Sequence, residues 1–154
     1  MKEKVIIALH DQFTGTTIRD FILKHDWHPR TEFHVAHVLE IPAPARPGDP
    51  KWDLGLKRAR ESASSLTGAF AELIRERSPD RQIQEHILEG RAADELVRLA
   101  QDQAASLIIM GCRGRRGWRR LLLGSVSGTV ANKAHCSVVI LKKNHLAFAR
   151  RKQA

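Results

Sequence analysis

The residues best suited to chemistry in this sequence are glycines and serines near a short apolar run. Gly111 directly follows the run Leu107–Met110, and Gly114 comes three residues later. Nine residues then separate Gly114 from the pair Gly124-Ser125, which opens a segment whose apolar residues have helical spacing. Glycine lets backbone N–H groups approach an anion closely, and the first turn of a helix carries free N–H groups and the positive end of its dipole. The pattern therefore predicts a phosphate site.

Two serines add hydroxyl groups to this predicted site. Ser125 is placed to cap the helix that follows, because a hydroxyl can accept from a free first-turn N–H, and Ser127 offers a second hydroxyl. The stretch has neither the Gly-Lys-Ser/Thr ending of a P-loop nor the glycine triplet of a dinucleotide fold. A plain turn with a helix cap is the alternative interpretation of these residues.

The pattern Met110-Gly111, two residues, Gly114, nine residues and Gly124-Ser125-Val126-Ser127 resembles that of the nucleotide-binding universal stress proteins. Weaker matches extend the resemblance over about the whole chain, and they are Val5–Leu9, His37-Val38 and Gly90–Val97. The resemblance implies a domain that binds an adenine nucleotide, with ATP as the expected ligand. It also implies a stress-response role as a binding or signalling module.

The same resemblance implies which residues would contact the nucleotide. Apolar residues would lie against the base and ribose, and they are Ala8, Leu9, Val38, Met110 and Val126. The phosphates and ribose would meet Gly111, Gly114, Arg115, Gly124, Ser125 and Ser127. Packing in the core is an alternative role for the apolar set, and one residue can serve both.

His10 departs from the family pattern. Nucleotide-binding members usually carry an acid at this position, whereas here the acid, Asp11, comes one residue later. A neutral imidazole can still accept one hydrogen bond. Alternatively, the end of the strand shifts so that Asp11 takes the place of the usual acid.

No arrangement of residues for catalysis can be read from the sequence. Neither a pair of carboxylates nor a nucleophile–His–acid set stands beside the glycine loop, so we expect no catalytic residues and at most slow hydrolysis of bound ATP. The eight histidines lack the spacing of metal ligands, and His34 and His37 would face opposite sides of a strand. We expect no protein-held metal, and any Mg²⁺ would be held by the phosphates and water.

Charge is unevenly distributed along the chain. The formal net charge is +9, yet all 17 acidic residues precede position 111, while 11 of the 26 basic residues follow it. Five of these lie in the predicted loop: Arg113, Arg115, Arg116, Arg119 and Arg120. We interpret the loop arginines as attracting an anionic ligand, with a solvated surface as the alternative. The basic residues of the tail are interpreted as solvated surface.

The elements that would position the site alternate along the chain. Apolar and β-branched runs predict strands over Val5–Leu9, Glu32–Leu39, Gln82–Leu88, Leu107–Met110 and Ser137–Leu141. Helical spacing predicts a helix capped by Thr16 or Thr17 and ending near Trp27, then Trp52–Arg77, Gly90–Ala104 and a helix from Ser125.

This alternation predicts a single-domain α/β fold: a five-stranded parallel sheet with helices on both faces, Rossmann-like. The resemblance specifies the adenine-nucleotide alpha hydrolase-like type. Ligands of such sheets bind beyond the strand carboxyl ends, where the strand order reverses. The first and fourth strands are the most continuously apolar, so we expect them to meet at that point.

Length and composition suggest one domain over residues 1–143 followed by a basic C-terminal tail over 144–154. The first apolar run is too short for a secretion signal, and no run approaches the roughly 20 residues of a membrane span. Two cysteines do not suggest a disulfide framework. We therefore expect a cytoplasmic protein without membrane partners.

The last predicted strand, Ser137–Leu141, is almost wholly apolar and is expected at an edge of the sheet. Unpaired backbone groups at such an edge invite pairing, so we expect a homodimer through this strand, as the resemblance also implies. The alternative is that residues 145–149 fold back to cover the edge.

Two rival functions are a nucleotide-free homodimeric interaction protein of the same fold and a nucleic-acid-associated protein that uses the basic C-terminal third. Nucleic acid is disfavoured because Trp118 is the sole aromatic residue among the arginines.

Overall fold

The computed structural model describes residues 3–41, 46–112 and 124–142. Strands and helices alternate along it, in the order β1 (Lys4–Leu9), α1 (Gln12–Lys24), β2 (Glu32–Leu39), α2 (Pro50–Arg77), β3 (Ile83–Glu89), α3 (Ala92–Asp102), β4 (Leu107–Cys112), α4 (Ser125–Lys133) and β5 (Ser137–Lys142). The strands form one parallel sheet in the order β3-β2-β1-β4-β5. The predicted α/β fold class is thus confirmed, and the strand order reverses between β1 and β4.

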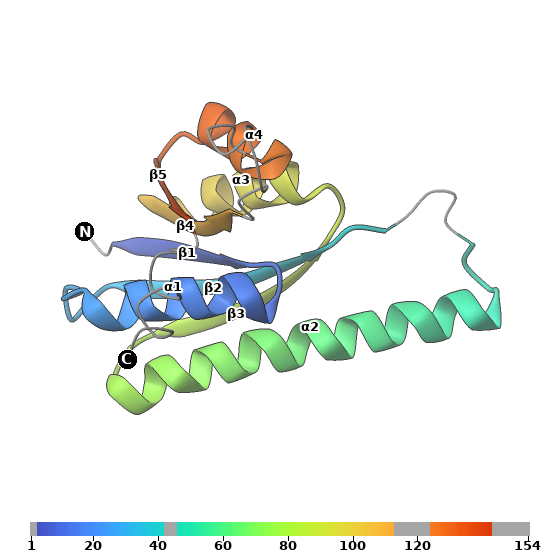
Figure 1. Ribbon diagram of the computed structural model, residues 1–154, viewed down its shortest axis with the longest axis horizontal. Helices are drawn as coiled ribbons and strands as arrows, with labels where there is room; N and C mark the ends of the chain where they lie inside the picture. The colour runs from blue at the N-terminus through green and yellow to red at the C-terminus, as the bar shows by residue number, and fades with distance from the viewer. Residues whose placement is uncertain (1–2, 42–45, 113–123, 143–154) are drawn as a thin grey trace, which may run out of the picture.

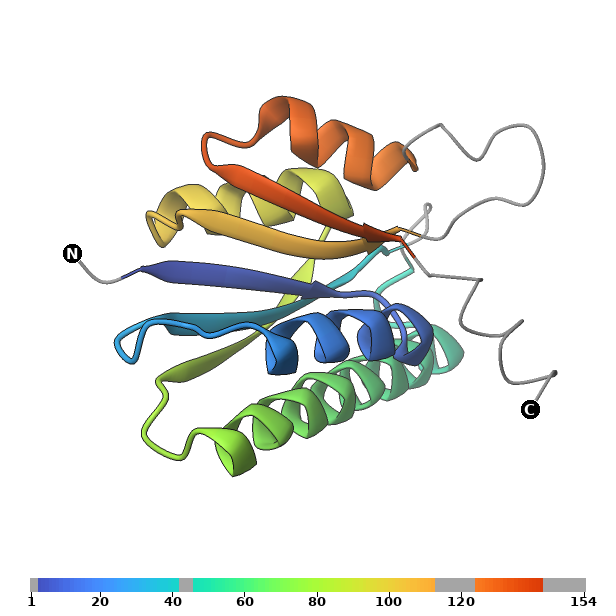
Figure 2. The ribbon, with the colours of Figure 1, turned by 60° about the vertical axis from the view of Figure 1, so that its left-hand side comes forward.

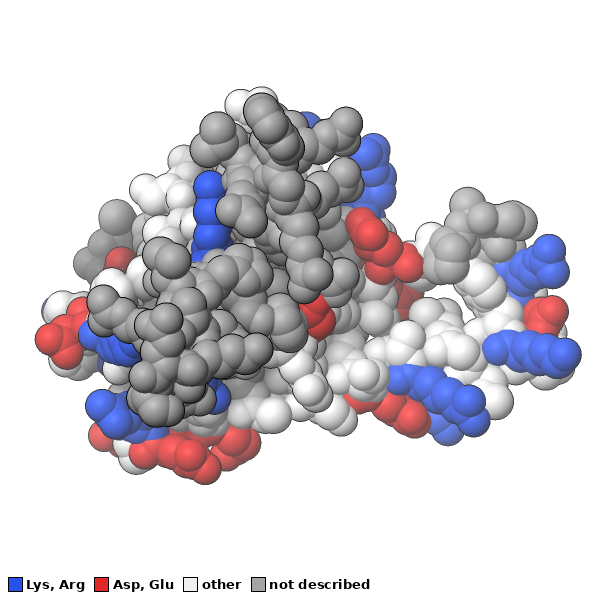
Figure 3. Space-filling model, in the orientation of Figure 1, with Lys and Arg blue, Asp and Glu red and all other residues white. Residues whose placement is uncertain are grey.

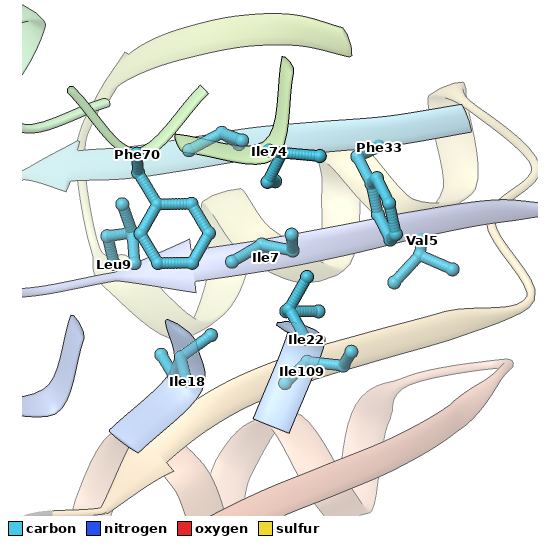
Figure 4. Packing of buried hydrophobic residues seen from close by; sticks show 10 residues of the cluster. Val5, Ile7, Leu9, Ile18, Ile22, Phe33, Phe70, Ile74 and Ile109 are labelled. Carbon is cyan, nitrogen blue, oxygen red and sulfur yellow. The ribbon is translucent and has the colours of Figure 1, made fainter. Parts of the chain in front are cut away.

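The four helices cover the two faces of the sheet in pairs, α1 and α2 on one side and α3 and α4 on the other (Figures 1 and 2). Alternate residues of each strand face opposite sides, which divides the core into two clusters. Figure 4 shows the cluster beneath α1 and α2, where Ile7 and Ile109 of the sheet meet Ile22 and Phe70 of the helices. On the other face, Ile6 and Ile108 pack with Leu96 and Leu99 of α3.

Helix starts differ from the sequence prediction at two places. Helix α1 begins at Gln12, because the carboxylate of Asp11 accepts from the backbone N–H of Thr14 at 2.7 Å; the predicted caps Thr16 and Thr17 lie inside the helix. Helix α4 has Gly124 as its N-cap, so Ser125 is the first helical residue and not the cap. Its hydroxyl therefore does not fill the role that was predicted for it.

The start of α2 and the end of β4 also differ from the sequence prediction, each for an identifiable reason. Asp49 caps α2 by accepting from the N–H groups of Lys51 and Trp52, so this helix starts at Pro50. Strand β4 continues through Gly111 to Cys112, because both residues pair with β5. Gly111 thus belongs to the strand rather than to a loop. Among the described helices, none combines the length and apolar character that crossing a membrane requires.

Candidate functional site

A cavity of about 460 Å³ opens at the carboxyl ends of the central strands, on the side of the sheet covered by α3 and α4. It lies where the strand order reverses, as the architecture predicts. Most of the predicted site residues line it: Ala8, Leu9, His10, Val38, Met110, Gly111, Gly124, Ser125, Val126 and Ser127. The fold thus brings residues from β1, β2, β4 and α4 together around one space.

Three predicted residues are not part of this described wall. Gly114 and Arg115 lie outside the described residues, as do Trp118 and the other loop arginines. Asp11 is described, but it lines a different cavity on the opposite face of the sheet. Its carboxylate accepts from both the N–H and the hydroxyl of Thr14, at 2.7 and 3.0 Å. Asp11 therefore acts as the cap of α1, and the wall of the candidate site does not include it.

The first turn of α4 forms one end of the cavity. Side chains cap the other helices: Asp11 caps α1, Asp49 caps α2, and Glu40 accepts from the first N–H of α3. The N-cap of α4, Gly124, has no side chain to do so. The hydroxyl of Ser127 donates to the carbonyl of Gly124 at 3.2 Å, which helps to hold the turn, while Ser125 is exposed. This turn offers backbone N–H groups to an anion.

The two described glycines of the motif have different surroundings. A Cβ on Gly111 would lie 2.6 Å from Cβ of Thr14, a distance that packing does not tolerate. Among the described residues, a Cβ on Gly124 would meet only the hydroxyl oxygen of Ser127, at 3.5 Å. Gly111 is therefore needed for the contact between β4 and α1, whereas no described residue fills the space at Gly124.

His10 follows β1 and lies between the two cavities, lining both. Its ring is parallel to that of His37, with an interplanar angle of 8° and 6.5 Å between centroids. Burial lowers the pKa of His37, which favours its neutral ring. Its Nδ1 donates to the carbonyl of Leu9 at 3.0 Å, because a carbonyl oxygen can only accept. This contact links the ends of β1 and β2 next to the candidate site.

Glu40 lines the cavity although sequence reasoning missed it. It directly follows β2, and its Oε1 accepts from the backbone N–H of Ala92 at 3.1 Å. The available signal was its place two residues after Val38, on the same face of an extended chain. Thr14, Ala92, Leu96 and Cys112 also belong to the wall, although none of them is among the predicted site residues.

A larger cavity of about 690 Å³ lies between α1 and α2 on the opposite face. Its walls include Ala59, Leu66 and Phe70 of α2, and the nearby N-terminus of α1 is already capped by Asp11. In the view of Figure 3, acidic and basic side chains lie toward the two ends of α2, and residues 62–71 between them carry no charge. Size alone does not make this cavity the better candidate, because it lacks an uncapped helix N-terminus. The described residues contain no group of three or more His, Cys, Asp or Glu that could hold a metal.

Comparison with known proteins decides the family. A model of the universal stress protein family matches residues 22–142. The chain belongs to this family. A universal stress protein of Methanocaldococcus jannaschii is 32% identical over 113 residues, which make up 73% of this chain and 65% of that protein. Another, from Thermus aquaticus, is 32% identical over 108 residues, or 70% of this chain and 75% of that protein.

Solved structures of universal stress proteins share the fold. Protein MJ0577 of M. jannaschii superposes with a TM-score of 0.70 at 19% identity, covering 94% of this chain and 99% of that one. The Archaeoglobus fulgidus protein, solved with dAMP, has a TM-score of 0.59 at 20% identity and covers 92% and 100%. An Arabidopsis thaliana member, solved with AMP bound, has a TM-score of 0.66 at 13% identity and covers 94% of both chains.

Proposed function

We propose that this universal stress protein binds an adenine nucleotide, with ATP as the expected ligand, in the cavity between β1, β2, β4 and the N-terminus of α4. The observation that carries the proposal is the uncapped first turn of α4, which opens into a cavity with apolar walls at the strand switch point. Solved relatives with AMP and dAMP bound support an adenine nucleotide.

The apolar and polar parts of the wall suggest how the ligand is held. Ala8, Val38, Met110 and Val126 provide a surface for the base and ribose, while the N–H groups at the start of α4 receive a phosphate. We expect the loop residues Gly114 and Arg115, which lie outside the described part of the chain, to contact the phosphates as well. Mg²⁺, where it accompanies ATP, is coordinated by phosphates and water.

We infer a role as a cytoplasmic stress-response module that binds its nucleotide rather than turning it over. In the described part of the cavity wall no side chain is placed as a general base beside the first turn of α4. Cys112 and Cys136 are both free, which suits a reducing compartment. A nucleotide-free interaction protein is the rival function, and the place of β5 at an edge of the sheet favours it, because an edge strand can pair with another chain.

Calorimetric titration tests nucleotide binding. We expect ATP to bind more tightly than adenosine, and its affinity to fall with added salt, because the α4 N-terminus and the loop arginines attract phosphate. Equal affinity for ATP and adenosine would contradict a phosphate site at α4. If neither binds, the nucleotide-free interaction protein becomes the better account.

Gly124→Val sharpens the same test. The backbone of Gly124 has φ −61° and ψ 160°, which valine adopts without strain, and its Cβ has room, so the fold should be retained. The branched side chain would stand where phosphate approaches, so ATP binding should be lost. Gly55→Val is the matched control, because Gly55 lies on the exposed part of α2 with no atom within 4 Å of its added Cβ.

A further inference from the structure

The candidate cavity has opposite electrical character at its two ends. Glu40 carries the sole carboxylate among the described residues of its wall, and it lies at the end formed by β2 and α3. The uncapped N-terminus of α4 lies at the end formed by β4. Strand β1 separates β2 from β4, so the two ends are roughly 10 Å apart across the sheet. A phosphate is attracted to α4 and repelled by Glu40.

The carboxylate of Glu40 is exposed, and a hydrogen bond to α3 orients it. Its Oε1 accepts from the N–H of Ala92, the first residue of α3, at 3.1 Å. Arg91, the N-cap of α3, contributes no side-chain cap, so Glu40 takes that role from the neighbouring strand. A carboxylate offers about four lone-pair positions, and this bond uses one of them. Glu40 therefore remains able to accept a hydrogen bond from a ligand.

This polarity orients a bound nucleotide. The phosphates lie at α4, so the base reaches toward Val38, Ala92 and Glu40 at the other end. A carboxylate accepts hydrogen bonds and does not donate them, so it favours an exocyclic amino group over a carbonyl oxygen on the base. Asp11 cannot make this selection from the cavity wall, because it caps α1 on the other face.

We propose that Glu40 selects the base of the nucleotide by accepting a hydrogen bond from its exocyclic amino group. This inference rests on the proposed nucleotide binding and adds a specificity-determining residue to it. It also explains why the cap of α3 comes from the end of β2: the same carboxylate joins the helix and the ligand.

ATP and inosine triphosphate provide the test, because they differ at the position where the purine carries an amino group or an oxygen. The unmodified protein should bind ATP roughly tenfold more tightly, as expected for one hydrogen bond to a charged group. In Glu40→Gln the amide oxygen can still accept from Ala92, whereas the NH₂ group can donate to the oxygen of inosine. The affinity ratio should therefore fall to about one or reverse.

Glu89→Gln is the matched control, since Glu89 ends β3 and pairs with Arg60 outside the cavity wall. Its ratio should equal that of the unmodified protein. An unchanged ratio in Glu40→Gln, even with both affinities lowered, would show that Glu40 only caps α3 and would overturn the inference while leaving ATP binding intact. Absence of ATP binding by the unmodified protein would overturn the proposed function and this inference together.

Discussion

Gly111 shows how one motif residue can have a different role from the one its position suggests. Its place after an apolar run predicts close approach to a phosphate. In the structure it is a residue of β4 that pairs with Leu141, and the missing Cβ makes room for Thr14 of α1. The residue lines the candidate cavity as well. Its small size is therefore explained first by packing between β4 and α1.

We predict that Gly111→Ala lowers the free energy of unfolding by about 1–3 kcal/mol, the usual cost of overpacking. The added Cβ would lie 2.6 Å from Cβ of Thr14, so α1 must shift away from β4. Gly55→Ala should have the opposite sign, a gain of about 0.5–1 kcal/mol, because Gly55 is an exposed helix residue with open space around it. Urea denaturation of the two variants measures both. A stable Gly111→Ala protein would contradict the packing role.

At the scale of elements, a buried histidine pair joins β2 to the edge strand β3. His34 is fully buried, and its Nδ1 lies 3.0 Å from Nε2 of His86. The other nitrogen of His34 lies 3.4 Å from the carboxylate of Glu32, which also accepts from the side chain of Gln84 at 2.7 Å. Two neutral imidazoles can share one proton across this contact, whereas two protonated rings would place donors against each other.

The groups around His34 have opposing effects on its pKa, and burial has the largest effect. Burial lowers the pKa of His34 to about 4, with a smaller lowering from His86, a raising effect from Glu32 and a small lowering from Lys4 of β1. Burial lowers the pKa of His86 as well. The pair is therefore neutral at pH 7, and no described residues complete it into a metal site.

We predict that the protein loses stability as the pH falls from 6.5 toward 4. The unfolded chain binds a proton at His34 near pH 6.5, whereas the folded chain binds it only near pH 4, so acid favours unfolding. A pKa difference of this size between the folded and unfolded chain corresponds to about 3 kcal/mol in the free energy of unfolding. Denaturation at several pH values should show that the free energy of unfolding depends less on pH in His34→Gln than in the unmodified protein. The same change at the exposed His135 controls for loss of an imidazole, and equal slopes for the two variants would contradict the prediction.

At the scale of the whole molecule, β5 occupies the edge of the sheet next to β4. Its N–H groups alternate in direction. That of Ser137 donates to the carbonyl of Ser106, which directly precedes β4, so those of Val138 and Ile140 point away from β4. We propose that this edge pairs with the same strand of a second chain about a two-fold axis. Residues 145–149, which could cover the edge instead, lie outside the described residues.

We predict a homodimer at micromolar concentration that Ile140→Pro disrupts, because proline removes an N–H that faces the partner. Ile140→Ala is the control for lost packing, and it should remain dimeric. Val139→Pro would be a poor choice, because the alternation directs its N–H toward β4 and the change would damage the sheet itself. Analytical sedimentation distinguishes the states. A monomeric unmodified protein would end the proposal and favour an edge covered by its own chain.

The amino-acid sequence by itself determined the order of the elements and most of the candidate cavity wall. Both depend on local information: apolar runs such as Val5–Leu9 form buried strands, helical spacing places the helices between them, and neighbouring parallel strands end at the same edge. Residues at those ends, such as Leu9, Met110 and Val38, therefore had to gather there. The short spacing of Gly111 and Gly124 placed α4 beside them.

Tertiary structure alone decided the features that depend on contacts between distant residues. His34 meets His86, and Glu40 meets Ala92, each across 52 positions of the chain, and neither pair carries a local pattern. Asp11 rather than Thr16 caps α1, because the folded chain places the carboxylate of Asp11 against the free N–H of Thr14. The role of Gly111 depends on the packing of Thr14 against β4. Hydrogen-bond competition and close packing are settled only when the chain has folded, because each depends on which partner the fold brings within reach.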